Sequence, residues 1–405
     1  MGQADRIADA LAAYVEAGQL AGAAALVWRP GREARVACAG WRDMEAGLPV
    51  ARDTLFRIAS LTKPVTSLAA LTMLEEGRFA LDEPITRWAP EFARMRVLRA
   101  VEGPLDATVP AERPITFEDL LTHRSGLTYG DFHQGPIARA YAEALGPDID
   151  SPVPPETWIA NLARLPLTDQ PGTAFRYGRA TDLLGFLLAR IEGAPLGEVL
   201  QRRVLGPLGM ADTGFVVPPE KRDRAARMYG FDDAGRLVRY VPPPGAPFLA
   251  DRPAGMTYVS GGAGLWSTLD DYLVFARVFV EAGAPGGARL LRPETVALMT
   301  ADRLTAEQRA QARLLGMNPF EGHGFGLGVA VVIDPAKAPV VRCRGGVGTV
   351  GWPGAFGGWW QADPTDGSVM IFLAHNQLQL EQLARGIGLG VYGAISEFHA
   401  MASAG

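Results

Sequence analysis

A serine and a lysine three residues apart form the strongest chemical pattern in the sequence. Ser60 and Lys63 stand near the start of residues 56–71, where apolar positions begin to recur at helical spacing. Side chains at this spacing share one helical face and come within reach of each other. A serine becomes a strong nucleophile when a neighbouring base takes its proton, and a lysine can be that base when burial or another cation lowers its pKa. The pattern therefore predicts a nucleophilic serine in the first turn of a buried helix, near free backbone N–H groups and the positive end of the helix dipole.

Lysine is rare in this chain, and its rarity strengthens the prediction. The sequence holds three lysines, Lys63, Lys221 and Lys337, and uses arginine at its other basic positions. Arginine serves equally well as a surface charge, but a guanidinium does not give up its proton and cannot act as a base. Lys221 and Lys337 lie in proline-containing segments that are typical of loops. A role as a base therefore explains the presence of a lysine at position 63 better than a role as a surface charge does.

A second stretch, residues 171–185, places Tyr177 on a turn just before a predicted helix. Beside an ammonium group, the phenol of a tyrosine can relay a proton. A tyrosine at such a position can equally well be a core residue. The residues of this stretch alone leave both interpretations open.

A third stretch, residues 344–360, is rich in glycine and tryptophan and contains a literal Gly-x-Gly-x-x-Gly from Gly346 to Gly351. A dinucleotide-binding loop of that pattern should open a helix in a βαβ unit. Here a strand-like run near the end of the chain follows instead. The glycines are better explained as positions where a substrate backbone approaches a strand closely.

With these three stretches, the chain resembles the serine β-lactamase and penicillin-binding-protein superfamily. It has the features of the class C-like fold and is most similar to the family VIII carboxylesterases. The resemblance covers nearly the whole chain, because three further phrases also match, at residues 120–127, 206–215 and 261–268. It implies an α/β (α+β) fold of the β-lactamase/transpeptidase type, with an antiparallel sheet flanked by helices and an inserted, mainly helical lobe.

The resemblance also implies roles for individual residues. Ser60 matches the acylated nucleophile and Lys63 matches its partner. Tyr177 matches the tyrosine of the family's Tyr-x-Asn element. In the same register, the backbone N–H groups of Ser60 and Ala355 would form the oxyanion hole. No metal or organic cofactor is implied.

Two positions depart from the pattern of the lactamases. Arg179 stands where the Tyr-x-Asn element has asparagine, and Trp352-Pro353-Gly354 stands where the lactamases have Lys-Thr-Gly. An indole offers apolar surface and one N–H in place of a cation for carboxylates. Losing such a charge pair, if desolvated, removes on the order of 2 kcal/mol or more of binding.

The family's esterases often carry Trp-x-Gly at this place, so the replacement predicts neutral, apolar acyl groups, with Trp352 and Gly354 among the substrate-binding residues. Arg179 or Arg344 could restore a cation, which leaves weak lactam hydrolysis open.

Tyrosine and histidine residues elsewhere in the chain are further candidates for the same site. Tyr129 follows Ser125-Gly126-Leu127 and is expected either as a second phenol that binds substrate or as rim packing. A Ser-His-Asp hydrolase would require Gly-x-Ser-x-Gly, and the sequence has no serine flanked in this way. His123 is expected as a structural residue at a helix end, whereas His375 ends a strand and could face the cleft.

The elements that must position these residues follow from periodicity and turn residues. An α/β lobe is expected from residues 1–88 and 255–405, with a mainly helical lobe at 89–254 and the active site in the groove between them. Strands are expected at 23–29, 34–41, 54–58, 326–333, 340–344, 355–362 and 369–374. Helices are expected near 7–15 and from Ser60 to about residue 77, and then at 118–122, 137–145, 157–164, 181–193, 196–205, 270–283, 293–300 and 377–398.

Composition excludes several classes of protein. The net charge is −5, and there is no basic stripe, which argues against a nucleic-acid partner. No run of eighteen apolar residues predicts a membrane span, and residues 1–6 lack the basic start of a signal peptide. A cytoplasmic protein is therefore expected, with Cys38 and Cys343 as buried thiols and no zinc site. The sequence carries no feature that sets an oligomeric state.

These observations predict a serine carboxylesterase that cleaves esters of short or medium acyl chains through an acyl-serine intermediate. Three alternatives stay open. The same acyl-enzyme could be passed to an alcohol or amine, as in an acyltransferase. The chain could also be a weak β-lactamase or a D-amino-acid-specific peptidase, or a non-catalytic binding protein with a vestigial site.

Overall fold

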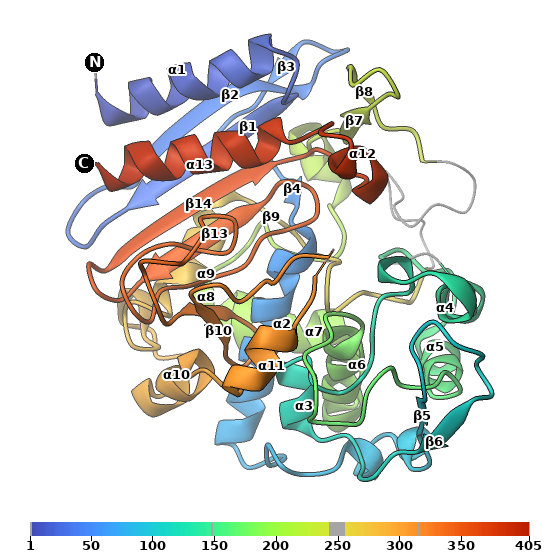
Figure 1. Cartoon of the computed structure of the whole chain (residues 1–405). Coiled ribbons are helices and arrows are strands. Elements are labelled where there is room, and N and C mark those ends of the chain that lie inside the picture. The colour runs from blue at the N-terminus through green and yellow to red at the C-terminus, as the bar shows by residue number, and fades with distance from the viewer. Residues whose placement is uncertain (1, 147–148, 243–255, 315, 405) are drawn as a thin grey trace.

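The computed structural model describes residues 2–146, 149–242, 256–314 and 316–404. Its centre is an eight-stranded antiparallel sheet with the strand order β10-β11-β12-β13-β14-β1-β2-β3 (Figure 1). The strands of this sheet are β1 (Gly22–Trp28), β2 (Arg35–Asp43), β3 (Leu48–Pro49), β10 (His323–Phe325), β11 (Ala330–Val332), β12 (Val350–Gly351), β13 (Trp359–Asp363) and β14 (Ser368–Ala374).

The two central strands of the sheet come from opposite ends of the chain. β1 pairs with β14 in antiparallel register, with Ala23 opposite Ala374 and Trp28 opposite Val369. Along β1 the side chains alternate between two cores, with Ala24 and Leu26 on one face and Ala23, Ala25 and Val27 on the other. Both faces of the central strands are therefore buried, which explains their nearly continuous apolar sequence.

Two terminal helices cover one face of the sheet and lie side by side, α1 (Gln3–Glu16) and α13 (Gly390–Ser403) (Figure 1). Ile7 and Leu11 of the first helix share a core with Ile395 and Phe398 of the second. The other face packs against α2 (Thr62–Glu75) and α9 (Leu269–Arg277). The sheet thus forms the middle layer of an α/β/α arrangement.

Most of the remaining helices lie between residues 117 and 208 and pack beside α2 rather than on the sheet (Figure 1). They are α3 (Phe117–Leu121), α4 (Gly135–Leu145), α5 (Pro155–Leu162), α6 (Ala180–Glu192), α7 (Leu196–Leu200), which continues as a π-helix (Gln201–Leu205), and α8 (Gly206–Leu208). Further helices are α10 (Pro293–Thr300), α11 (Ala306–Gln311) and α12 (Leu380–Ala384).

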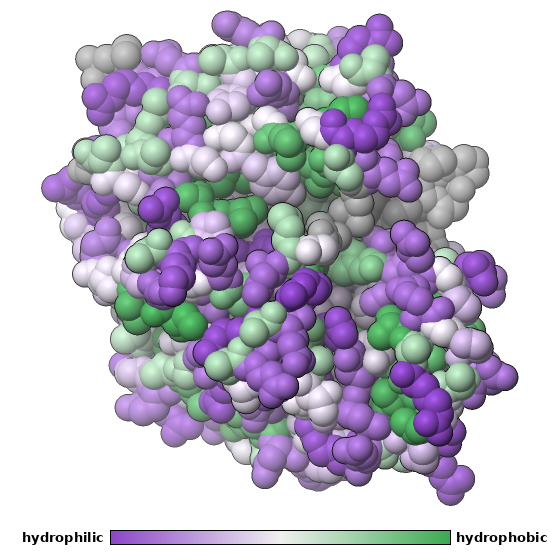
Figure 2. Space-filling model, in the orientation of Figure 1, coloured by the Kyte–Doolittle hydropathy of each residue, from purple (hydrophilic) through white to green (hydrophobic). Residues whose placement is uncertain are grey.

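Short elements complete the described chain. Three two-stranded sheets pair β4 (Phe56–Arg57) with β9 (Trp266–Ser267), β5 (Arg96–Leu98) with β6 (Thr108–Pro110), and β7 (Tyr229–Phe231) with β8 (Leu237–Arg239). Single 3₁₀ turns lie at Ala59–Leu61, Ile85–Arg87, Pro90–Phe92, Gly130–Phe132, Pro219–Arg224 and Pro285–Gly287. On the face of the molecule in Figure 2, hydrophilic residues predominate and hydrophobic residues form small separate patches.

Several expected elements differ in the structure. The strand expected at 340–344 is wrong, because this segment belongs to the connection between β11 and β12 and its groups bond to side chains instead of a ladder. The Val340 carbonyl accepts from the Trp359 indole, and the Arg344 amide donates to Gln361. The strand expected at 355–362 begins only at Trp359, and the strand expected at 54–58 pairs outside the main sheet.

The closing helix expected at 377–398 is interrupted. Gly386 and Gly388, at φ values of 83° and 82°, adopt the left-handed conformation that ends a helix, so α12 and α13 form as separate helices. The division into two lobes stays a prediction, and its boundary at residue 255 lies outside the described residues.

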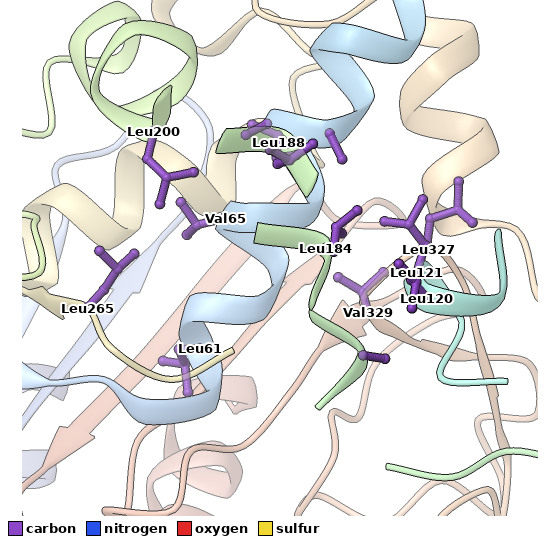
Figure 3. Close-up of a cluster of buried hydrophobic side chains, with 14 of the residues drawn as sticks. Leu61, Val65, Leu120, Leu121, Leu184, Leu188, Leu200, Leu265, Leu327 and Val329 are labelled. Carbon is purple, nitrogen blue, oxygen red and sulfur yellow. The ribbon is translucent and has the colours of Figure 1, made fainter. Parts of the chain in front are cut away.

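A leucine-rich core joins α2 to the helices beside it. Figure 3 shows Leu61 and Val65 near the start of α2, together with Leu184 and Leu188 of α6 and neighbours from other segments, including Leu120, Leu121, Leu327 and Val329. These side chains are 1% exposed or less. Such packing fixes the start of α2, where Ser60 and Lys63 lie.

Truncation of this core is expected to destabilise the protein strongly. Leu184→Ala should lower the free energy of unfolding by about 2–5 kcal/mol, because it removes buried methyl groups and leaves a cavity. Leu389→Ala is the matched control, since that side chain is 50% exposed, and it should cost less than about 1 kcal/mol. Urea unfolding of both variants measures the difference, and equal losses would contradict the role given to this core.

Candidate active site

Ser60 lies in a tight turn between a short strand and the long helix α2. The turn Ala59–Leu61 follows β4, which the Ile58 amide extends by donating to the Leu265 carbonyl. Ala59 has a φ of 44°, a left-handed conformation that is uncommon for residues other than glycine. Strain of this kind persists only where the surrounding structure enforces it, and it often marks a functional site. Ser60 itself is half-buried.

Lys63 is the buried partner of this serine. Its side chain is within hydrogen-bond distance of three polar groups, the Ser60 hydroxyl at 3.3 Å, the Tyr129 hydroxyl at 3.1 Å and the Gly262 carbonyl at 2.8 Å. The residue is 2% exposed, and Nζ also lies 4.6 Å from the centre of the Tyr177 ring. These three contacts fix the nitrogen beside Ser60, and as a free amine it can donate to the Gly262 carbonyl and the Tyr129 hydroxyl while its lone pair accepts from the Ser60 hydroxyl.

The Gly262 carbonyl is held in place by a buried carboxylate. Asp182 Oδ1 accepts from the Gly262 amide at 3.1 Å and from the Ser260 hydroxyl at 2.5 Å. Arg179 lies 3.6 Å from the other carboxylate oxygen, and both side chains are buried. Asp182 and Gly262 were not predicted as site residues, although both lie in stretches that carry the family resemblance, residues 171–185 and 261–268.

Tyr177 and Trp352 meet at the same site. The Trp352 indole N–H donates to the Tyr177 hydroxyl at 2.9 Å, and the two ring centres are 5.2 Å apart. Gly178, next to Tyr177, has no room for a side chain, because a Cβ would lie 2.3 Å from the Thr128 carbonyl carbon. Within the described chain, the Tyr177 hydroxyl is hydrogen-bonded to Trp352 and to neither Ser60 nor Lys63.

A second phenol is nearer to the lysine amine. Tyr129 accepts the hydrogen bond from Lys63, and its ring centre lies 5.7 Å from that of Tyr177. The guanidinium of Arg179 lies 5.0 Å from the Tyr129 ring centre. The structure thus brings Ser60, Lys63, Tyr129, Tyr177 and Trp352 together, and places Tyr129 in contact with the amine rather than at the rim.

The segment after Trp352 packs directly against the serine turn. A Cβ on Gly354 would lie 2.8 Å from the Ile58 carbonyl, so only glycine allows this close approach. The next residue, Ala355, is exposed, and its N–H makes no hydrogen bond within the described chain. A free amide beside the serine turn is suited to bind a developing oxyanion.

The histidines of the site region are neutral. His123 packs against Tyr177, with ring centres 4.8 Å apart, and burial together with the nearby Lys63 charge holds its pKa well below the usual value. His375 donates from Nδ1 to the Ala226 carbonyl at 2.8 Å, and burial lowers its pKa to about 3. His375 is buried among Phe56, Trp266 and Phe356, which fits a core role rather than the cleft position that remained open in the sequence.

The low pKa of His375 has a consequence for stability. An unfolded histidine titrates near pH 6.5, so below that pH the unfolded chain binds a proton at this residue. The folded chain binds that proton only near pH 3, because burial lowers the pKa of His375. Stability is therefore lost as the pH falls through 6.5. His375→Gln should reduce the loss of unfolding free energy between pH 7.5 and 5 by about 2 kcal/mol, measured by urea unfolding at both pH values. An unchanged pH dependence would contradict a neutral, buried His375.

Metal and membrane features are not found in the described chain. Its His, Cys, Asp and Glu side chains form no group of three that could hold a metal ion. Cys38 and Cys343 are free thiols there, and Cys343 is buried as expected, whereas Cys38 is only half-buried. Among the helices of the described residues, none is long and apolar enough to cross a bilayer.

The chain is similar to known proteins in both sequence and structure. Residues 7–386 match the family model described as Beta-lactamase. An uncharacterized protein of Mycobacterium tuberculosis is 48% identical over 361 residues, which cover 88% of this chain and 86% of that protein. Esterase EstB of Burkholderia gladioli is 34% identical over 368 residues, which cover 88% and 86%.

Among solved structures, EstCE1, described as a hydrolase with promiscuous acyltransferase activity, superposes with a TM-score of 0.77. It is 28% identical, and the match covers 97% of this chain and 98% of that one.

Proposed function

The chain belongs to the beta-lactamase family, and we propose that it cleaves carboxylic esters of short or medium acyl chains through an acyl-serine intermediate. The family and the mixed fold, with helices around an antiparallel sheet, imply an enzyme of the serine hydrolase or acyl-transfer type. The single observation that carries the proposal is the buried Lys63 amine, hydrogen-bonded to the hydroxyl of Ser60.

In the acylation step, Lys63 takes the proton of Ser60 as the serine oxygen attacks the ester carbonyl. The Gly262 carbonyl and the Tyr129 hydroxyl hold the amine in position during this transfer. The Trp352 indole occupies one acceptor position of the Tyr177 oxygen, which leaves the phenol proton available for the departing alcohol. The backbone N–H groups of Ser60 and Ala355 stabilise the oxyanion.

In the deacylation step, the Tyr177 phenolate takes a proton from a water molecule, which attacks the acyl-serine, and the protonated Lys63 returns its proton to the Ser60 oxygen as the acid is released. The reverse proton transfers restore the starting state. The cycle uses protons and side chains of this chain and requires no added cofactor.

The surroundings of Tyr177 favour an apolar acyl chain. Tyr177 and Trp352 belong to a buried apolar cluster with Phe175 and Phe325, against which the half-buried Tyr129 and Phe132 pack. An acyl chain of a few carbons would bury its methylene groups against such side chains, at about 0.8 kcal/mol for each.

Acyl transfer is the second candidate, because EstCE1 is described as a hydrolase with promiscuous acyltransferase activity. The same acyl-serine would then be attacked by an alcohol instead of water. Product analysis with an added alcohol separates the two outcomes, since transfer yields a new ester and hydrolysis yields the free acid.

Mass spectrometry of the intact protein tests the proposed function. After brief exposure to 4-nitrophenyl butyrate, the protein should gain the mass of one butyryl group, and Ser60→Ala should gain none. A fluorophosphonate probe should label the same serine. A protein that is neither acylated nor labelled would contradict the proposal, as would labelling that persists in Ser60→Ala.

The choice of substrate is tested separately. Turnover of 4-nitrophenyl butyrate should exceed that of the cephalosporin nitrocefin, because Trp352 and the aromatic side chains around it offer apolar surface to an acyl chain. Faster turnover of nitrocefin would contradict an esterase and favour a lactamase.

A further inference from the structure

Arg342 is a buried cation without a counter-ion. It lies in the connection between β11 and β12, and the residue is 7% exposed. Across the described residues, its side chain makes no ion pair and no hydrogen bond, and Nε is sealed from solvent without an acceptor. Other buried arginines differ, since Arg57 pairs with Asp150 at 2.7 Å and Arg179 lies 3.6 Å from an Asp182 oxygen.

An arrangement of this kind is costly to a folded protein. Burial lowers the pKa of Arg342, but a guanidinium stays charged at neutral pH. Its guanidinium lies over the Trp352 ring, with Cζ 5.1 Å from the ring centre, which offsets part of the cost. This contact leaves the N–H donors at the edge of the guanidinium unused, and these donors fit a carboxylate in a two-point hydrogen bond.

Contacts connect Arg342 to the proposed catalytic residues. Trp352 contacts Arg342 and also donates to the Tyr177 hydroxyl, and the Tyr177 ring packs on the Lys63 amine. Another phenol that interacts with the Arg342 charge, Tyr392 of α13, stays neutral because burial raises its pKa. No group of the described chain therefore supplies the negative charge that Arg342 lacks.

We propose that Arg342 binds a carboxylate of the substrate, so that the preferred esters carry an acidic group. The inference rests on the proposed ester hydrolysis and names the substrate class of that site. From the sequence, Arg179 or Arg344 could replace the cation of the missing lysine. The structure pairs Arg179 with Asp182 and exposes Arg344, whereas Arg342 lies against the tryptophan that took the place of the lysine.

Two pairs of esters test this assignment and distinguish the two sides of the ester bond. On the acyl side, 4-nitrophenyl hemiglutarate is compared with 4-nitrophenyl hexanoate. On the alcohol side, 4-carboxyphenyl butyrate is compared with 4-acetylphenyl butyrate. In at least one pair, the wild-type kcat/KM should favour the acidic ester by at least about tenfold.

Variants then identify the residue responsible. Arg342→Met should reduce the preference for the acidic ester to about one, and Arg342→Lys should keep part of it because it retains a charge. Arg344→Met is the matched control, an exposed arginine two residues along the same connection, and it should leave the preference intact. Thermal unfolding of each variant shows whether it is folded.

The outcomes of these measurements distinguish a failure of the Arg342 assignment from a failure of the proposed ester hydrolysis. Cleavage of the neutral esters without any preference for the acidic ones overturns the role of Arg342 and leaves the proposed function standing. No cleavage of any ester counts against the proposed function itself. An equal loss on acidic and neutral esters in Arg342→Met would show that the arginine only supports Trp352. If that variant does not fold, the wild-type preference and Arg342→Lys decide.

Discussion

Replacement of Lys63 by methionine is expected to lower kcat/KM for 4-nitrophenyl butyrate by at least about a thousandfold. Methionine nearly preserves the length and apolar stem of the side chain, so the buried position stays filled. The amine that is hydrogen-bonded to Ser60 is removed, and the hydroxyl loses the base proposed to take its proton. Initial rates and fluorophosphonate labelling measure the loss.

Two further lysine variants make this result specific. Lys63→Arg keeps the positive charge but cannot accept a proton, so it should be about as inactive as the methionine variant. Lys221→Met is the matched control, because Lys221 is bonded to Asp212 and to the Ala211 carbonyl, away from Ser60. It should retain nearly full activity. A Lys63→Met enzyme with a tenth or more of the wild-type rate would contradict Lys63 as the base.

Removal of the Tyr177 hydroxyl is expected to cost about a hundredfold or more in kcat, because the phenol is proposed to protonate the leaving alcohol. Tyr129→Phe should cost about tenfold or less, since Lys63 would keep its bonds to Ser60 and to the Gly262 carbonyl. Steady-state kinetics of both variants with 4-nitrophenyl butyrate show which loss of kcat is larger.

Each of these variants deletes one oxygen and keeps the ring, so packing changes little. Trp352→Phe adds a control, because it removes the hydrogen bond to Tyr177 while preserving an aromatic side chain. It should shift kcat less than Tyr177→Phe does. A larger loss in Tyr129→Phe than in Tyr177→Phe would indicate that Tyr129, and not Tyr177, protonates the leaving alcohol.

The pairing of Ser60 with Lys63 was predictable because it is local. Three residues along a helix bring two side chains together whatever the rest of the fold does, and the 3.3 Å contact follows from that spacing. The meeting of Tyr177 with Trp352 is a tertiary contact, which the spacing of residues could not supply. The family resemblance placed both residues at one site, and the structure brings them together.

The contacts that were missed all depend on tertiary structure. Asp182 lies in the first turn of α6, where an acidic residue is explained by the helix dipole alone, and nothing in its local sequence pointed to the Gly262 amide. Arg342 was expected in a strand, where its side chain would have had no special position. The turn that it occupies instead brings its guanidinium onto Trp352.

The errors in the predicted elements have two origins. Val340 to Arg344 has the residue types of a strand, but β11 and β12 pair directly and leave this segment outside the ladder. The break between α12 and α13 comes from the left-handed conformations of Gly386 and Gly388. Glycine is a poor helix former, so the local sequence already carried this signal, and the prediction of one long helix gave it too little weight.

The pairing of β1 with β14 also bears on how the protein is made. During synthesis, the first strand leaves the ribosome long before its neighbour exists, so one edge of the early hairpin stays open until nearly the whole chain has been translated. Messages cut short before β14 should therefore yield insoluble or rapidly degraded polypeptide rather than a weakened enzyme. Chaperone demand should be high for this protein, and refolding from denaturant should be slow, because the sheet cannot close without joining both ends of the chain.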